Sequence, residues 1–127
     1  MGKKPLILIV DDEWAIHELI RIQFSKDRFR VSSATNGIEC RELIRKEKPD
    51  LLMLDIVLGE EDGTSLYTDL VMEGLDSKIP VIFMSSLAQD RPPAPLSKER
   101  KFALIGKPFD VRALTQQISD LLQPDSR

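Results

Sequence analysis

Side chains that can do chemistry stand at the ends of four short apolar runs in this 127-residue chain. The acidic pair Asp11-Asp12 follows the first run, Asp55 ends the second, Ser85 ends the third, and Lys107 follows the fourth. Short apolar runs with turn signals on both sides are typical of buried strands in a parallel sheet. Because parallel strands end at the same edge of a sheet, we expect these groups to meet there.

Three carboxylates at one sheet edge repel one another. At about 4 Å and an effective dielectric near 20, each like-charged pair costs about 4 kcal/mol. Asp11, Asp12 and Asp55 must therefore take up protons, stay apart, or bind a cation. Oxygen-only ligation with room for water suits Mg²⁺. Lys107 adds one fixed positive charge.

The same groups are suited to phosphoryl transfer. The Asp55 carboxylate can act as a nucleophile and take up a phosphoryl group. A divalent cation and the Lys107 ammonium would offset the charge on the transferred oxygens, and Ser85 would donate a hydrogen bond to one of them. Each residue also has a plainer interpretation. Asp11 or Asp12 caps a helix, Ser85 and Asp55 belong to turns, and Lys107 is a solvated loop lysine.

Strand-like and helix-like patterns alternate along the chain. The predicted strands are Leu6 to Val10, Phe29 to Ala34, Asp50 to Asp55, Pro80 to Met84 and Lys101 to Gly106. The predicted helices run from Glu13 to Ser25, Ile38 to Lys48, near Gly63 to Gly74, and Val111 to Leu122. This alternation indicates an α/β fold, a doubly wound five-stranded parallel sheet with right-handed crossovers. The second strand is expected at an edge.

A proline-rich stretch interrupts the alternation where a helix is expected between the last two strands. Pro92, Pro93 and Pro95 lie within four positions, and an interior proline costs a helix about 3 kcal/mol. We therefore expect residues 88–96 to be irregular or extended, so that the fourth helix is degraded. The length indicates a single domain over 1–127, with its core at about 5–123 and a frayed tail at 124–127.

Separate blocks, spread over nearly the whole chain, resemble the receiver domain of two-component response regulators. They are Leu8-Ile9-Val10-Asp11-Asp12-Glu13, Ala34-Thr35-Asn36-Gly37-Ile38-Glu39, Pro49-Asp50-Leu51-Leu52-Met53-Leu54-Asp55-Ile56, Asp62-Gly63, Pro80-Val81-Ile82-Phe83-Met84-Ser85-Ser86 and Lys107-Pro108-Phe109. Each block alone is weak, but their order and spacing together are specific. The resemblance implies the flavodoxin-like strand order 2-1-3-4-5.

The resemblance also implies a role for each matching residue. Asp55 is the implied phosphoacceptor, and Lys107 the phosphate-binding lysine. The implied Mg²⁺ ligands are Asp12, Asp55 and the backbone carbonyl of Val57, with Asp11 acting through a water molecule. The chemistry of these side chains, derived above, agrees with these roles.

Ser85 takes the family's switch hydroxyl position, and a cis Lys107-Pro108 bond is implied. The chain departs from the family at three places. The family usually has proline where this chain has Gly59, which predicts a more mobile loop after the phosphoacceptor. At the position of the family's switch aromatic, this chain has Leu104. The proline-rich stretch replaces most of the fourth helix, which belongs to the family's usual output face.

The leading hypothesis is a phosphorylation-dependent signalling switch, and not an enzyme with separate substrate turnover. A sensor histidine kinase or phosphotransfer protein would supply the phosphoryl group. Few residues follow the last predicted helix, so output on an unknown downstream protein is expected to act in trans. The alternative is a receiver-fold interaction module that signals without phosphorylation.

Two other protein classes fit poorly. A phosphatase with an aspartate nucleophile has a second acid two residues after the first, where this chain has Val57. In a flavin carrier of similar topology the first loop binds the flavin phosphate, which Asp11-Asp12-Glu13 would repel.

Composition limits the remaining function classes. The net charge is −3, and no basic stripe suggests nucleic acid. The longest apolar run, Leu6 to Val10, is too short to span a membrane, and the start is not a signal peptide. Cys40 is the only cysteine, which favours a reducing cytoplasm and rules out a disulfide. We expect a monomer or weak dimer.

Three further features receive structural interpretations. His17 is expected near the surface with a structural role. Trp14 is expected to pack near the site and to report Mg²⁺ binding by its fluorescence. The run Glu60-Glu61-Asp62 is expected to form a solvated acidic loop.

Overall fold

Five parallel strands form one sheet in the computed structural model, which describes residues 4–24, 29–86 and 100–123. The strands are β1 (Leu6–Val10), β2 (Arg30–Ala34), β3 (Leu51–Asp55), β6 (Val81–Ser85) and β7 (Phe102–Gly106). Their order is β2-β1-β3-β6-β7, with every neighbouring pair parallel. Counted along the chain, this is the order 2-1-3-4-5, so the predicted fold class is confirmed, with the second strand at an edge.

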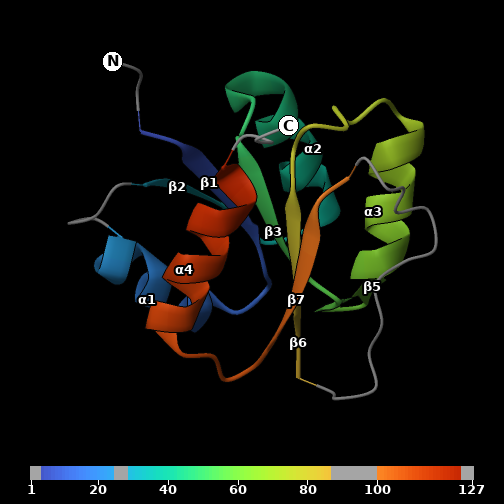
Figure 1. Cartoon of the computed structure of the whole chain (residues 1–127). Helices are drawn as coiled ribbons and strands as arrows, with labels where there is room; N and C mark the ends of the chain where they lie inside the picture. Colours follow the sequence, from blue (N-terminus) through green and yellow to red (C-terminus); the bar gives the residue numbers. More distant parts are fainter. Residues whose placement is uncertain (1–3, 25–28, 87–99, 124–127) are drawn as a thin grey trace.

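Helices cover both faces of this sheet (Figure 1). They are α1 (Trp14–Phe24), α2 (Gly37–Glu47), α3 (Gly63–Met72) and α4 (Val111–Leu122). Helices α1 and α4 lie on one face, and α2 and α3 on the other. The predicted loss of a helix at 88–96 and the frayed tail at 124–127 lie outside the described residues.

Alternate side chains of the central strands fill two separate cores. In β1, Ile7 and Ile9 pack with α1 and α4, whereas Leu8 and Val10 pack with α2 and α3. Strands β3 and β6 alternate in the same way. Full burial of each such side chain stabilises the fold by about 1.5–3 kcal/mol. This two-sided packing fixes the carboxyl ends of β1, β3 and β6 at one edge.

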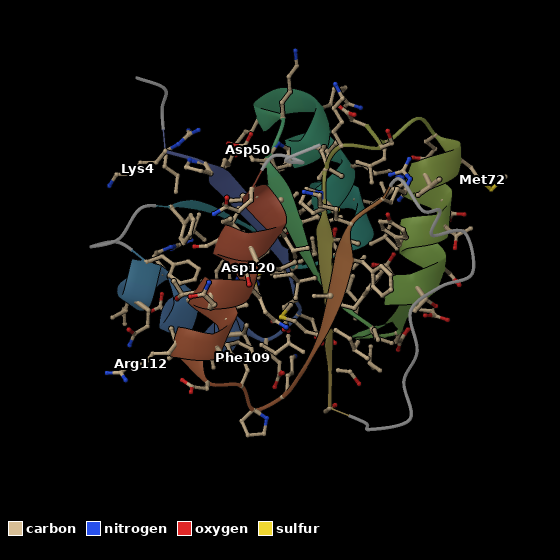
Figure 2. All side chains as sticks on the ribbon, viewed as in Figure 1. Lys4, Asp50, Met72, Phe109, Arg112 and Asp120 are labelled. Atoms are coloured by element: carbon tan, nitrogen blue, oxygen red, sulfur yellow. The ribbon has the colours of Figure 1, made fainter. Side chains whose placement is uncertain are left out.

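Local hydrogen bonds set where the helices begin. The side chain of Asn36 accepts a hydrogen bond from the Glu39 amide at 2.9 Å and caps α2. Asp62 caps α3 and Asp110 caps α4 in the same way, through amides two residues on. These caps satisfy amides that would otherwise lack partners. The outer helix faces are exposed, as at Met72 on α3 (Figure 2).

The segment after Asp55 differs from the predicted loop. It contains a short antiparallel hairpin of β4 (Val57–Leu58) and β5 (Glu61–Asp62). Glu61 Oε1 accepts a hydrogen bond from the Gly37 amide at 2.9 Å, which ties the hairpin to the start of α2. Glu60, Glu61 and Asp62 are all exposed, as expected, but Glu61 and Asp62 form a strand and bind helix amides, so the interpretation as a loop was wrong. Two of these three carboxylates hold helix N-termini, a position that favours negative charge.

Candidate functional site

Asp55 ends β3 with its carboxylate held on both oxygens. Only 5% of the residue is exposed. Oδ1 accepts a hydrogen bond from the Val57 amide at 3.1 Å, and Oδ2 accepts one from Lys107 Nζ at 2.8 Å. The amide bond is local, but the lysine comes from the far end of the chain. The carboxylate is thus oriented by groups from two different strand ends.

Lys107 links Asp55 to the acidic residues that follow β1. Its ammonium lies 2.7 Å from Asp11 Oδ2 and 3.2 Å from Glu13 Oε1. The Lys107 amide donates to the Ser85 carbonyl at 2.6 Å, which fixes the backbone beside β6. The bond to Pro108 is cis, as predicted. Glu13 was not singled out from the sequence as a partner of this lysine.

Three carboxylates gather at this edge of the sheet, as expected. Asp11, Asp12 and Asp55 each bring one oxygen to within 4.8 Å of the others. Asp11 is fully buried, and its oxygens accept hydrogen bonds from the Glu13 amide and Lys107. Asp12 is exposed, and among the described residues no hydrogen bond or ion pair holds its carboxylate. Asp12 is therefore the member most available to a cation.

The electrostatics of the cluster favour a cation. Burial raises the pKa of Asp55 above its usual range; the Lys107 hydrogen bond opposes this, and the nearby Asp11 charge adds to the rise. Burial alone would lower the pKa of Lys107, but its hydrogen bonds to Asp11 and Asp55 outweigh that effect and raise it. The lysine thus stays charged, yet its one ammonium pairs with Asp11, Asp55 and Glu13, and Asp12 adds a further negative charge to the cluster. The donor set, all oxygen and strongly negative, fits a hard divalent ion.

Two glycines shape the backbone around Asp55. A Cβ added to Gly63 would overlap the Asp55 carbonyl oxygen, so only glycine allows α3 to start this close to β3. Gly59 has φ of 60°, which proline cannot adopt because its ring holds φ near about −65°. A Cβ added to Gly59 would lie 3.5 Å from Asp12 Oδ2. The glycine in place of the family's proline therefore permits a turn conformation against the acidic cluster.

A hollow of about 280 Å³ lies over the cluster, and Ser86 lines it. Its other lining residues are Asp12, Glu13, Asp55, Val57, Gly59 and Lys107. Ser85, the hydroxyl chosen from the sequence, is 4% exposed and ends β6. Leu104, at the position of the family's switch aromatic, is exposed on β7. The structure thus places a second hydroxyl at this edge, which the strand pattern alone did not single out.

His17 is fully buried, so the prediction that it lies near the surface was wrong. Its Nε2 lies 2.7 Å from the Asp11 carbonyl oxygen, and its ring centroid is 5.0 Å from that of Trp14. Trp14 is itself 58% exposed. Because a carbonyl oxygen only accepts, Nε2 is the donor, and the ring supports the backbone of Asp11 from within α1. The helical period indicated that His17 shares a face with Ile20 and Phe24, which would have predicted its burial.

A doubly wound sheet with this strand order, an acidic cluster and a lysine at its carboxyl edge defines a receiver-type α/β protein. Family comparison matches residues 7–119 to the response regulator receiver domain. The chain belongs to this family. Its members are signalling modules that accept a phosphoryl group, and not enzymes that turn over a separate substrate.

Individual relatives agree with this assignment. The chain is 29% identical to sporulation initiation phosphotransferase F of Bacillus subtilis over 91% of this chain and 92% of the relative. It is 31% identical to the DNA-binding dual master transcriptional regulator RpaA of Synechocystis, over 97% of this chain but 51% of that protein. The chain thus spans about half the length of RpaA. Among solved structures, the Francisella response regulator 1452 receiver domain superposes with a TM-score of 0.78 at 25% identity, over 93% of this chain and 96% of that one.

None of the described helices is long and apolar enough to cross a lipid bilayer.

Proposed function

We propose that this chain is a single receiver domain that works as a phosphorylation-dependent switch, with Asp55 as the phosphoacceptor. The observation that carries the proposal is the Asp55 carboxylate, which faces a hollow between Lys107 and two further carboxylates. A carboxylate held in this way can act as a nucleophile once it is deprotonated. Lys107 opposes the rise in the pKa of Asp55 and so favours the reactive form.

The proposed reaction transfers a phosphoryl group from a phosphohistidine donor. A carboxylate oxygen of Asp55 forms a bond to phosphorus while the bond between phosphorus and the histidine nitrogen breaks. The histidine nitrogen keeps the electron pair and leaves as neutral imidazole after protonation. Lys107 stays within reach of the transferred oxygens because its amide is anchored to Ser85. Ser85 is proposed to donate a hydrogen bond to the phosphoryl group.

Mg²⁺ is the proposed cofactor. Asp12, Asp55 and the backbone carbonyl of Val57 would hold it, with Asp11 acting through a water molecule. The hydrogen bonds of the two acids support a direct role for Asp12 and an indirect one for Asp11. Asp11 already accepts two hydrogen bonds, whereas Asp12 accepts none among the described residues. Bound Mg²⁺ would offset negative charge on the phosphoryl oxygens.

The proposed partners are a sensor histidine kinase or phosphotransfer protein upstream and a protein target downstream. Similarity to a phosphotransferase along nearly its whole length supports a place in a phosphorelay. Output in trans stays a prediction, because the matched relatives include a chain of this length and one about twice as long. A cytoplasmic location and a monomer or weak dimer also stay predictions of the sequence.

Phosphorylation by a small donor tests the proposal directly. The protein is incubated with phosphoramidate and Mg²⁺, and intact mass and a phosphate-affinity gel report the product. We expect one phosphoryl group per chain, lost in Asp55→Asn and in the presence of EDTA. Asp110→Asn, the same change at a helix cap, should be modified like the unaltered protein. The absence of modification would favour the alternative of an interaction module that signals without phosphorylation. Modification of Asp55→Asn would refute Asp55 as the phosphoacceptor.

A further inference from the structure

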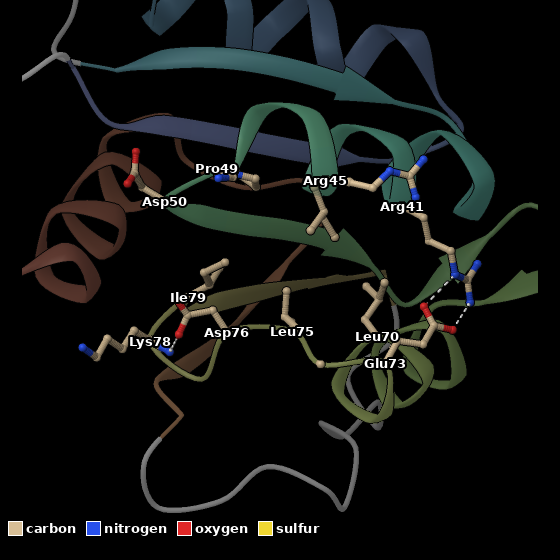
Figure 3. Close-up of a pocket in the computed structure, with 13 residues that line it drawn as sticks. Arg41, Arg45, Pro49, Asp50, Leu70, Glu73, Leu75, Asp76, Lys78 and Ile79 are labelled. Atoms are coloured by element: carbon tan, nitrogen blue, oxygen red, sulfur yellow. Dashed lines mark hydrogen bonds and ion pairs between the residues drawn. The ribbon is translucent and has the colours of Figure 1, made fainter.

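A second and larger hollow lies at the opposite edge of the sheet from Asp55. It has a volume of about 680 Å³, within the range of small-molecule sites. Its walls come from the C-terminal half of α2, the turn into β3, the end of α3 and the loop before β6 (Figure 3). Pro49 and Ile79 precede the amino ends of β3 and β6, whereas Asp55 and Ser85 lie at their carboxyl ends. Occupation of this cleft therefore leaves the acidic cluster accessible.

The floor of the cleft is aliphatic. Leu70 and Leu75 are buried beneath it, and Ile44 and Ile79 are only partly buried. The isoleucines therefore leave apolar surface facing the hollow. No aromatic side chain is among the described residues that line it, so these offer a nucleobase no ring on which to stack. The floor suits a saturated apolar group.

The acidic residues of the lining already have partners within the protein. Asp50 Oδ2 accepts a hydrogen bond from the Leu6 amide at 2.8 Å, and Asp76 Oδ1 accepts one from the Lys78 amide at 3.0 Å. Glu73 pairs with Arg41 at 3.0 Å, the contact drawn in Figure 3. None of these carboxylates needs a ligand to satisfy it.

Three basic side chains at the edge of the cleft, here called the rim cations, lack such partners in the described part of the chain. Within residues 4–24, 29–86 and 100–123, no ion pair or side-chain hydrogen bond holds Arg45, Lys48 or Lys78. They come from both walls. Arg45 and Lys48 lie at the end of α2, and Lys78 lies in the loop before β6. Their long stems allow the charged ends to turn toward a bound group. The described lining holds four basic and three acidic side chains, so it offers a small excess of positive charge above an apolar floor, in a chain whose net charge is −3.

Lys48 adds a second, independent observation. It is the only non-glycine residue with positive φ in the described part of the chain, at 49°, and it caps α2. Glycine is the usual residue there because an L side chain is strained in the left-handed region. The chain thus keeps a lysine at the cleft rim where glycine would be less strained. Strained residues of this kind cluster at functional sites.

We propose that this cleft binds a small organic anion with a saturated apolar body, such as a medium-chain carboxylate or its phosphate-ester counterpart. The aliphatic floor takes the apolar body, and Arg45, Lys48 and Lys78 take the anionic head. The inference stands apart from the proposed phosphorylation, because the two sites lie at opposite edges of the sheet. Binding can be measured on the unphosphorylated protein.

A simpler account of these cations is that they stabilise the C-terminal end of the α2 dipole. Lys46 separates the two accounts. It lies in the same last turn of α2 and is exposed, but it does not line the cleft. Lys46→Ala removes the same favourable charge from the helix end and leaves the cleft unchanged, so it is the matched control for Arg45→Ala.

The test is a titration of the whole chain, labelled with ¹⁵N, with octanoate, octyl phosphate, butyrate and octylammonium. We expect saturable shifts at the Ile44 and Ile79 amides for both octyl anions. Butyrate should bind at least about tenfold more weakly because it buries fewer methylenes. Octylammonium, with the same chain and the opposite charge, should not bind there.

Variants decide whether the rim cations hold the anion. Arg45→Ala and Lys48→Gly should each weaken octanoate binding about fivefold, and Lys46→Ala less than about twofold. Lys48→Gly should fold at least as well as the unaltered chain, because glycine adopts positive φ freely. The proposal is wrong if no anion gives saturable shifts, if octylammonium binds equally well, or if Lys46→Ala weakens binding as much as Arg45→Ala.

Discussion

Replacing Asp55 by asparagine should stabilise the metal-free protein, although the same change removes the proposed phosphoacceptor. The reason is the charge balance at the sheet edge, where the single ammonium of Lys107 forms ion pairs with Asp11, Glu13 and Asp55. Asparagine keeps nearly the same shape and one oxygen that can accept from the Val57 amide. Its NH2 group then faces Lys107, so the ammonium must turn toward Asp11 and Glu13. Lys107 keeps its bond to Asp11. The change therefore removes a buried charge without leaving a lysine unpaired.

The expected size follows from the distances. At an effective dielectric near 20, the lost attraction to Lys107 at 2.8 Å amounts to about 6 kcal/mol. The repulsion relieved from Asp11, within 4.8 Å, is at least about 3.5 kcal/mol, and Asp12 adds a smaller, solvent-screened share. The attraction exceeds the Asp11 repulsion by at most about 2.5 kcal/mol, and the Asp12 repulsion narrows that difference, so the cost of burying the carboxylate decides the sign. We expect a gain of about 1–2 kcal/mol, or roughly 3–8 °C in Tm.

The pH dependence has a definite sign. The folded-state pKa of Asp55 is raised above its ordinary 3.8, so the folded protein binds the proton more tightly than the unfolded chain does. Stability from this group is fully present below the unfolded pKa and is lost as pH rises through the folded pKa. The advantage of Asp55→Asn should therefore vanish at low pH, grow across that window, and stay constant above it.

Urea unfolding in EDTA, repeated at several pH values, measures this advantage. Asp110→Asn is the matched control, because asparagine caps a helix as well as aspartate, and its stability should change by less than about 0.5 kcal/mol. Added Mg²⁺ should stabilise the unaltered protein more than Asp55→Asn, by mass action, and so narrow the gap. A metal-free Asp55→Asn protein that is less stable than the unaltered one at neutral pH, with a neutral control, would refute the reasoning.

Three further predictions concern the surroundings of the site. Gly63→Ala should cost at least about 2–3 kcal/mol, measured by urea unfolding, because its Cβ would overlap the backbone of Asp55; an unchanged midpoint would contradict the close approach. Ser85→Ala should slow phosphorylation by phosphoramidate about tenfold in a timed phosphate-affinity gel, with Ser86→Ala as the control; a larger effect of Ser86→Ala would move the role to that hydroxyl. Trp14 emission should change on Mg²⁺ addition and not in Asp12→Asn, because the Trp14 ring lies against the His17 ring, which binds the backbone carbonyl of Asp11.

Much of the fold follows from local sequence patterns. Apolar runs such as Leu51 to Leu54 can be buried on both faces only inside a parallel sheet covered by helices. Their alternation with helical periods indicates the doubly wound architecture before any distance is known. The strand order itself came from the family resemblance. The acids at the strand ends were also evident, because a charge that ends an apolar run must lie at a sheet edge.

Other features depended on how distant segments pack. The sequence placed Lys107 near the acids, but its contacts with Asp11 and Glu13 join residues 96 and 94 positions apart. Such contacts depend on strand twist, side-chain direction and helix position, which a local pattern does not encode. The link from Glu61 to Gly37 has the same origin. The burial of His17 differs, because the helical period that it shares with Ile20 and Phe24 already indicated it.

The sequence by itself determined which groups could react, and that Asp11, Asp12, Asp55 and Lys107 would share one edge of a parallel sheet. Only the tertiary structure decided which carboxylate oxygens the lysine holds, and which acid stays available to a cation. The physical reason is how far apart in the sequence the interacting residues lie. Burial patterns and chain direction are read from neighbouring residues, whereas the partition of one ammonium among several acids depends on distances of a few ångströms between remote strand ends.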